Sequence, residues 1–187
     1  MDLSVLTPKN LTITTKRLSI YPMLSEHKEE FKQLQCDENL MAFIGPILDE
    51  NALSDKFNQR ISCFEDNQQW FTLLINERKD SSDVSPSKFI GSVGFRLVDI
   101  ECQRVEIGYL ALSASQGKGY ITEAGDALIH FLKEKLKVKK IVANCAVENI
   151  ASWKVMEKMG LQKEGTLKAD FKVNENWFDA YTYALVF

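Results

Sequence analysis

The sequence predicts an α+β fold: one domain built on a mixed, mostly antiparallel central sheet with helices on both faces. Three observations support this. Short apolar runs typical of strands recur along the chain, two stretches carry a helical stripe of apolar residues, and one strand-helix-strand succession is compact enough to make its two strands parallel. The 187 residues suit a single domain with its own core.

The first half of the chain is predicted to hold a strand, a helical region and an antiparallel meander. Leu11 to Tyr21 alternates in polarity and is expected to form the first strand. Residues 25–66 favour helix, with a break at Gly45-Pro46. Polar residues predict a loop over 77–88. The meander strands are expected at 70–75, 89–98 and 105–112.

The second half is predicted to alternate helices and strands. Asn149 suits a helix N-cap, and Gly160 suits a left-handed residue at the helix end. The expected elements are a helix over 120–136, a strand over 140–147, a helix over 150–159, and a hairpin of 165–173 with 177–187. The strand at 140–147 should lie parallel to the one at 105–112, so both helices begin at the same edge of the sheet.

Composition excludes several functional classes. A net charge of −3 argues against a generally basic nucleic-acid binder. Four scattered cysteines without a C-x-x-C pair predict neither a zinc site nor a disulfide framework, and no other metal site is expected. Without a signal sequence or a long apolar segment, and with scattered thiols, the chain is expected in the cytoplasm and not in a membrane.

A glycine-rich turn, QGKGYITEA, joins the strand ending near residue 112 to the following helix. Gly117 and Gly119 lack a Cβ where a phosphate could approach the backbone, and Lys118 and Thr122 add a charge and a hydroxyl. The turn matches neither the P-loop nor the GxGxxG pattern. The turn by itself is therefore compatible with a phosphate site and with a purely structural role.

Several segments resemble the GNAT superfamily of acetyl-CoA-dependent N-acetyltransferases, and specifically its RimJ/RimL-like branch, which acetylates ribosomal protein N-termini. The opening Thr14 to Met23 resembles the first strand of that branch, and residues of the last strand are also similar. The resemblance implies a GNAT-like fold over residues 1–187 and is weakest over 25–88. The segments that carry it are EIGYLAL, QGKGYITEA, KKIVANCAVEN, NIASWKVMEKMGL and EGTLK.

The resemblance also implies an acetyl-CoA site. The pyrophosphate would bind main-chain N–H groups of the turn, and pantetheine would pair with the preceding strand as an added strand. Ile121 stands where the family has Gly or Ala; because it heads the apolar stripe of its helix, we expect it to point into the core. The implied cofactor-binding residues are Leu110, Ala111, Leu112, Gln116, Gly117, Lys118, Gly119, Tyr120, Ile121, Thr122, Asn149 and Ser152.

Two catalytic residues are expected. Glu106 corresponds to the general base of several superfamily members, although a strand Glu paired with a surface Lys is an alternative. Ser152 would lie near the thioester sulfur, but a helix cap alone would also explain Asn149 and Ser152. Met156 stands where many members have a tyrosine acid, which leaves Ser152 or water to protonate the thiolate.

The expected partners are acetyl-CoA and an amine acceptor, without nucleic acid or membrane; a homodimer is left open. A protein N-terminus is favoured as acceptor, because an α-amine with a pKa of about 8 is neutral far more often than a lysine with a pKa of about 10.4. Residues 25–66 contain ten acidic and four basic residues, which suits a cationic acceptor such as a basic tail, an aminoglycoside or a polyamine. A non-catalytic acyl-CoA-binding module is the competing hypothesis.

Overall fold

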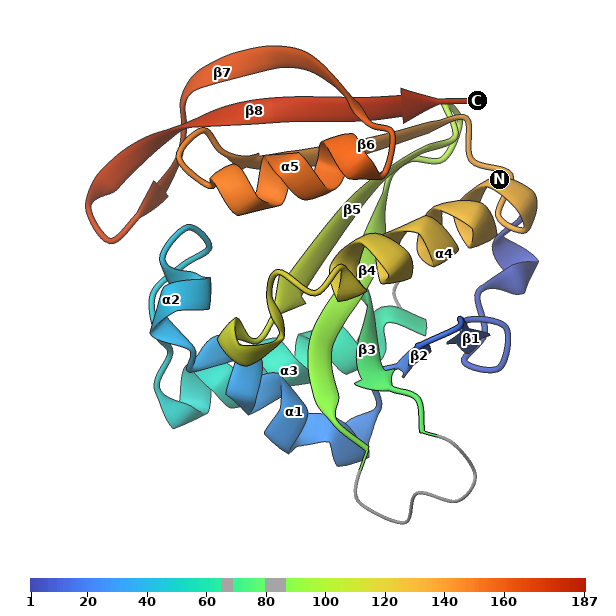
Figure 1. The fold of residues 1–187 in the computed structure, drawn as a ribbon, viewed down its shortest axis with the longest axis horizontal. Coiled ribbons are helices and arrows are strands. Elements are labelled where there is room, and N and C mark those ends of the chain that lie inside the picture. Colours follow the sequence, from blue (N-terminus) through green and yellow to red (C-terminus); the bar gives the residue numbers. More distant parts are fainter. Residues whose placement is uncertain (65–68, 80–86) are drawn as a thin grey trace.

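The chain folds around one mixed sheet in which β5 and β6 are the parallel pair. The computed structural model describes residues 1–64, 69–79 and 87–187, and its strand order is β1-β2-β3-β4-β5-β6-β8-β7 (Figure 1). The other neighbouring strands of this sheet pair antiparallel. The predicted α+β fold with a mixed, mostly antiparallel sheet is therefore confirmed.

The described residues form eight strands and five α-helices. The strands are β1 (Ile13–Thr14), β2 (Leu18–Pro22), β3 (Phe71–Glu77), β4 (Phe89–Asp99), β5 (Arg104–Ala111), β6 (Lys140–Ala146), β7 (Gln162–Val173) and β8 (Asn176–Val186). The helices are α1 (Lys28–Gln35), α2 (Glu38–Met41), α3 (Glu50–Ile61), α4 (Tyr120–Glu134) and α5 (Ile150–Lys158). The predicted loop over 77–88 lies mostly outside the described residues.

The predicted first strand over 11–21 was wrong in one respect, because the chain turns in its middle. It forms two short antiparallel strands, with Ile13 opposite Ile20. The Thr15 N–H donates to the Leu18 carbonyl at 2.9 Å, and the Leu18 N–H donates to the Thr15 hydroxyl at 3.0 Å. Ile13 and Leu18 are an odd number of positions apart, five, so one regular strand could not have buried both on one face.

Helices cover both faces of the sheet. Leu73 and Ile75 of β3 belong to the larger buried cluster, which includes the apolar stripes of α4 and α5. Leu74, on the opposite face, packs with Phe31 of α1 and Phe57 of α3. Figure 1 shows α4 and α5 in front of the sheet and α1 to α3 gathered below the β7–β8 hairpin.

The strands β5 and β6 separate after a short paired stretch. They pair only from Arg104–Glu106 to Lys140–Val142, although both continue further. β4 pairs with β5 up to Ala111, and β8 pairs with β6 along its length, so the open edges of β5 and β6 face each other across the gap. Because the two strands are parallel, α4 and α5 begin at the same end of this opening (Figure 1). Each helix begins at its predicted residue.

The C-terminal hairpin forms as predicted, with a turn at Asn174 and Glu175, whose φ angles are 45° and 50°. Its strand β7 contains a bulge: Lys168 to Asp170 lie opposite Asp179, and Ala169 has a φ of 47°. Asp179 holds the bulge by accepting hydrogen bonds from the Ala169 N–H at 2.9 Å and the Lys168 ammonium at 2.7 Å. A bulge re-aims the residues that follow it, and here it turns this end of the hairpin toward α2.

Candidate active site

The turn between β5 and α4 presents main-chain donors as predicted. Gly117 and Gly119 have φ angles of 73° and 76°, a conformation that side chains with a Cβ rarely adopt. The Glu123 N–H donates to the Gly119 carbonyl at 3.1 Å, so the N–H groups before it in the first helical turn have no helical acceptor. These donors, at the positive end of the helix dipole, suit a pyrophosphate.

The side chains of the helix's first two residues support the turn from inside. Ile121 is 9% exposed and belongs to the larger core cluster, so it points into the core as expected. Tyr120 is also buried, and its hydroxyl donates to Glu77 at 2.5 Å. Thr122 lies beside Gly119 in a shallow groove on the outer surface.

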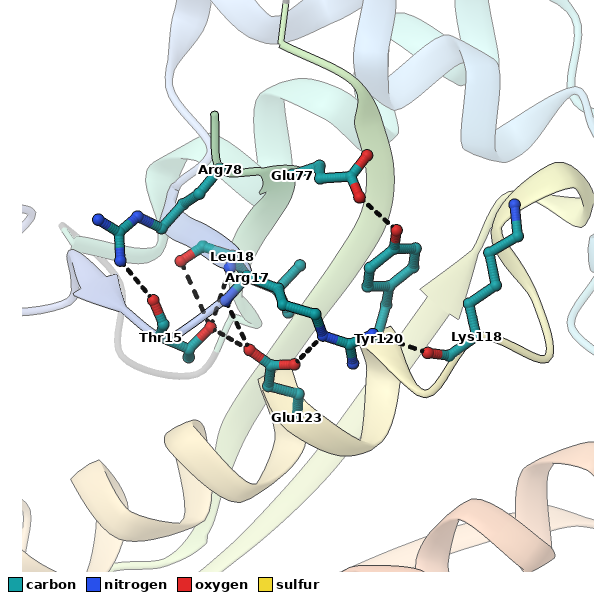
Figure 2. A network of polar contacts seen from close by, with 8 residues as sticks. All are labelled: Thr15, Arg17, Leu18, Glu77, Arg78, Lys118, Tyr120 and Glu123. Atoms are coloured by element: carbon teal, nitrogen blue, oxygen red, sulfur yellow. Dashed lines mark hydrogen bonds and ion pairs between the residues drawn. The ribbon is translucent and has the colours of Figure 1, made fainter. Parts of the chain in front are cut away.

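A charged network holds this turn against the start of the chain (Figure 2). Arg17 donates from Nε to Glu123 at 2.6 Å and from a terminal nitrogen to the Lys118 carbonyl at 3.0 Å, while its guanidinium lies over the Tyr120 ring. The Thr15 hydroxyl donates to Glu123 at 2.6 Å. Burial alone would raise the pKa of Glu123, but the hydrogen bonds from Thr15 and Arg17 and the charge of Arg17 hold that pKa below its ordinary value.

Sequence reasoning missed Arg17 and Glu123, because nothing local connects them. Arg17 does stand inside the opening segment that resembles the family, which was the available signal. Gln116 and Lys118, which were predicted, turn back onto the loop: the Gln116 amide donates to the Ala111 carbonyl at 3.1 Å, and the Lys118 ammonium donates to the Ala114 carbonyl at 2.9 Å.

The predicted pantetheine-pairing residues need a correction. The Leu112 N–H donates to the Ile90 carbonyl at 3.0 Å, and the Leu110 carbonyl lies against Gly91, so both residues direct main-chain groups toward β4. Backbone groups alternate along a strand, so those of Tyr109 and Ala111 face the opening toward β6. Of Leu110, Ala111 and Leu112, only Ala111 is therefore placed for strand-like pairing, while the Leu110 side chain lines the cavity described next.

A cavity of about 470 Å³ lies where β5 and β6 separate, and it joins the two faces of the sheet. Glu106, Asn149 and Ser152 all line it, so the structure brings together three predicted site residues from β5 and the start of α5. The remaining wall comes from α1, α3, β4, β6, the start of β3 with the preceding Trp70, the chain after α2, the bulge of β7 and the facing part of β8.

Glu106 is held in this cavity by an arginine. Arg96 of β4 donates to Glu106 Oε2 from Nε at 2.7 Å and from Nη2 at 2.5 Å. Glu106 Oε1 accepts only a long hydrogen bond from the Asn144 amide, at 3.3 Å, among the contacts of the described residues. The Glu106 side chain is 14% exposed. The alternative of a Glu paired with a surface Lys is thus replaced by a cavity Glu paired with Arg96.

Ser152 lies in the capped first turn of α5 and also lines the cavity. The Ser152 N–H donates to Asn149 Oδ1 at 3.1 Å, which makes Asn149 the predicted N-cap. The Tyr109 hydroxyl donates to the Ser152 carbonyl at 2.8 Å and lies 3.1 Å from its Oγ. Burial raises the pKa of Tyr109, so the phenol stays protonated.

Tyr109 was not singled out from the sequence, although strand alternation could have found it. Its side chain lies on the opposite face from Glu106, which is the face that α5 covers. Met156, which stands at the usual tyrosine position, is 2% exposed and offers no hydroxyl. Tyr109 of β5 thus brings a phenol to Ser152 from another element.

The acidic character of residues 25–66 does not extend to the cavity. Among the described residues of that segment, the charged side chains that line the cavity are Lys56 and Arg60, and the others are apolar or neutral. Glu65 and Asp66 lie outside the described residues. The cavity lining therefore gives no support to a cationic acceptor, because none of the described carboxylates of this segment lines the cavity.

The described part of the chain lacks a metal-binding cluster, a membrane-spanning helix and a disulfide. It contains no group of three or more His, Cys, Asp or Glu side chains that could hold a metal ion. No helix within it is long and apolar enough to cross a membrane. All four cysteines are free thiols.

Comparison with known proteins gives the family. Residues 17–162 match the acetyltransferase (GNAT) domain family. The protein called Uncharacterized N-acetyltransferase YnaD of Bacillus subtilis (strain 168) is 28% identical over 176 residues, which cover 93% of this chain and 96% of that protein. The Ribosomal-protein-serine acetyltransferase of Escherichia coli (strain K12) is 31% identical over 99 residues, covering 53% and 55% of the two chains.

A solved structure shares the fold over nearly the whole chain. The Microcin C7 self immunity acetyltransferase MccE, solved in complex with acetyl-CoA and AMP, superposes with a TM-score of 0.80 at 22% identity, covering 98% of this chain and 99% of that one. The family match spans most of the sequence and includes β5, the glycine turn, β6 and α5. This chain belongs to the acetyltransferase (GNAT) family.

Proposed function

We propose that this acetyl-CoA-dependent N-acetyltransferase acetylates a primary amine, with Glu106 accepting the proton of the amine and Ser152 assisting departure of the thiol. One observation carries the proposal. Glu106 and Ser152 lie on different elements, yet they line one cavity at the point where the open edge of β5 meets the start of α5. The acceptor we propose is the N-terminal α-amine of a protein.

The residues present fit acetyl-CoA as substrate. The Cβ-free turn at Gly117 and Gly119 and the free donors after it suit the pyrophosphate, and the open edge at Tyr109 and Ala111 suits the pantetheine amides. When bound, acetyl-CoA supplies the thioester carbonyl that the amine attacks. A direct attack needs no covalent enzyme intermediate, and orientation of the two substrates provides much of the acceleration.

Glu106 is suited to accept a proton through Oε1. Arg96 occupies Oε2 with two short hydrogen bonds and so fixes the carboxylate in the cavity wall. Oε1 has only the 3.3 Å contact with Asn144, which leaves it lone-pair capacity for a water or an amine. The proton that the amine loses when its nitrogen bonds to the acetyl carbon would pass to this oxygen.

Ser152 and Tyr109 form a hydroxyl pair on the opposite wall. The Tyr109 proton satisfies the Ser152 carbonyl, which lets the Ser152 hydroxyl donate to the Tyr109 oxygen at 3.1 Å. When the C–S bond breaks, the Ser152 hydroxyl can turn to donate its hydrogen bond to the departing thiolate while keeping its proton. Tyr109 acts as a positioning residue in this scheme, since its raised pKa keeps its proton in place.

The choice of an α-amine has two supports. An amine with a pKa of about 8 is neutral far more often at neutral pH than a lysine side chain, and so requires less of the base. A relative that matches about half of the chain is named for ribosomal-protein serine acetylation. The non-catalytic alternative loses both of its arguments, since Ile121 is buried and Tyr109 places a hydroxyl near the site.

The test is thiol release from acetyl-CoA with a panel of amines. The panel contains peptides with a free N-terminus, N-terminally blocked peptides with one lysine, an aminoglycoside and a polyamine. We expect the free N-terminal peptides to give the highest kcat/KM. Preferential use of the blocked lysine peptides, the aminoglycoside or the polyamine would contradict the α-amine assignment, and no release with any amine would contradict the transfer itself.

A further inference from the structure

Two cations of α3 face the cavity, and neither has a carboxylate partner within residues 1–64, 69–79 and 87–187. Lys56 and Arg60 are four residues apart, on one side of the helix, and both line the cavity. The Lys56 ammonium donates to Gln35 Oε1 at 2.7 Å, which is a neutral partner. Among the described residues, no carboxylate lies within ion-pair distance of Lys56 or Arg60.

The second cation is placed by an aromatic ring. The Arg60 guanidinium lies 5.2 Å from the centre of the Trp70 ring, and that of Arg96 lies 5.5 Å from the same ring. Trp70 in turn packs over Gly108 of β5, the residue two positions after Glu106. The cations of α3 therefore lie along the same wall as the Arg96–Glu106 pair.

The charges of this wall do not balance. Arg96 is neutralised by Glu106, and the remaining carboxylate of the cavity lining, Asp170, is exposed at the rim. Burial lowers the pKa of Lys56, and it lowers that of Arg60 to about 10 with a further contribution from the nearby Arg96 charge. Partly desolvated cations without a counter-ion are costly, and an anion of a ligand would offset that cost.

We propose that the acceptor carries an anionic group, a carboxylate or a phosphate, that binds Lys56 and Arg60 while its amine lies toward Glu106. The inference rests on the proposed function and adds a substrate class to it. The proposed charge of the acceptor is opposite to the one expected from the charge of residues 25–66.

The experiment compares acceptors of different charge, with each kcat/KM expressed per neutral amine so that differences in amine pKa do not contribute. Three peptides of equal length begin with serine and carry Asp, Asn or Lys at positions two and three; a second series compares O-phosphoethanolamine, serine and serinamide. The peptide series tests an acidic N-terminus, and the small-amine series tests a free metabolite-sized anion. In at least one series we expect the anionic acceptor to exceed its neutral counterpart in kcat/KM by about tenfold, the size of one charge-assisted contact.

Variants of the two cations locate the effect. Lys56→Gln and Arg60→Gln should each raise the KM of the anionic acceptor about tenfold and leave kcat/KM of the neutral acceptor within about twofold. Lys32→Gln is the matched control, because Lys32 of α1 pairs with Glu50 and does not line the cavity. It should change neither value, and thermal unfolding reports whether each variant is folded.

The parent protein offers a second readout if a variant fails to fold. Salt should raise the KM of the anionic acceptor and leave that of the neutral acceptor unchanged. Equal use of neutral or cationic acceptors, or an anionic preference that survives both substitutions, would overturn the proposed anion site while transfer to amines still stands. Absence of transfer to every amine would instead contradict the proposed function.

Discussion

At the glycine turn Arg17 and Glu123 neutralise each other and brace the backbone, whereas on α3 Lys56 and Arg60 face the cavity and no described carboxylate pairs with them. The difference corresponds to two ways of binding. A site made of main-chain N–H groups needs a rigid support. The charges of that support must be paired with each other, so that only the N–H groups are left to bind the ligand. A charged side-chain site keeps its charge unmatched until the ligand arrives, which makes the ligand's charge a criterion of selection.

Glu106→Gln should give the largest effect, because it removes the proposed base. Glu106 lies on the same cavity wall as the two α3 cations. It keeps the size of the side chain but removes the basic oxygen, so turnover should fall by about 10²- to 10⁴-fold with little change in the KM for acetyl-CoA. The loss should shrink at high pH, where more of the amine is already neutral. Steady-state rates across pH measure this.

Glu164→Gln is the control for this substitution. Glu164 of β7 is also a strand carboxylate, paired with Lys140 at 2.7 Å, but it does not line the cavity. It should have parental turnover. A Glu106→Gln protein with a parental pH–rate profile and reduced stability would make Glu106 a structural partner of Arg96 only.

Gly119→Val directly tests the glycine turn as the pyrophosphate site. A branched side chain there blocks access to the main-chain donors, so the KM for acetyl-CoA should rise about tenfold or more. Excess acetyl-CoA should stabilise the parent against heat by about 2.7 kcal/mol at a hundred times its Kd, and this variant should lose most of that shift.

Two sets of controls make this result specific to the turn. Gly160, at the end of α5, is also left-handed, with a φ of 83°, so Gly160→Val strains the backbone as Gly119→Val does. Gly160→Val should lose about 1–2 kcal/mol of folding stability and keep the stabilisation by acetyl-CoA. Lys56→Gln and Arg60→Gln should also keep the stabilisation by acetyl-CoA. If the α3 variants lost the shift and Gly119→Val retained it, the assignment of the two regions would be reversed.

Tyr109→Phe should have a smaller effect, because it removes one hydrogen bond from Ser152 and leaves the serine in place. A loss of about 1 kcal/mol corresponds to roughly fivefold lower turnover. Ser152→Ala should cost more than Tyr109→Phe. Tyr181→Phe is the control, since Tyr181 faces Lys163 outside the cavity, and an equal loss in that variant would argue against a specific role for Tyr109.

Glu123→Gln should have the smallest effect, confined to stability and its pH dependence. The pKa of Glu123 is lower in the folded protein than in the unfolded chain, so its contribution to stability is present above the ordinary Glu pKa of about 4.3 and is lost as pH falls through the folded value. Thermal unfolding of parent and variant should therefore differ at pH 7 and converge in acid. A constant difference across this range would mean that the charge of Glu123 does not brace the turn.

The sequence by itself determined the order of the elements, the glycine turn, the Asn149 cap and the inward direction of Ile121. These features depend on neighbours within a few residues, because apolar periodicity and helix capping are local. The split of the first strand was not predicted, although the alternation loses its phase between Ile13 and Leu18.

Only the tertiary structure decided which side chains meet. Arg17 and Glu123 are 106 residues apart, and Tyr109 and Ser152 are 43 apart, so their contacts depend on strand order and on which face each helix covers. The tertiary structure also decided that Lys56 and Arg60, and not the acids around them, face the cavity. The net charge of a segment does not say which of its side chains face a site. The packing of a helix on the sheet decides which way each side chain points.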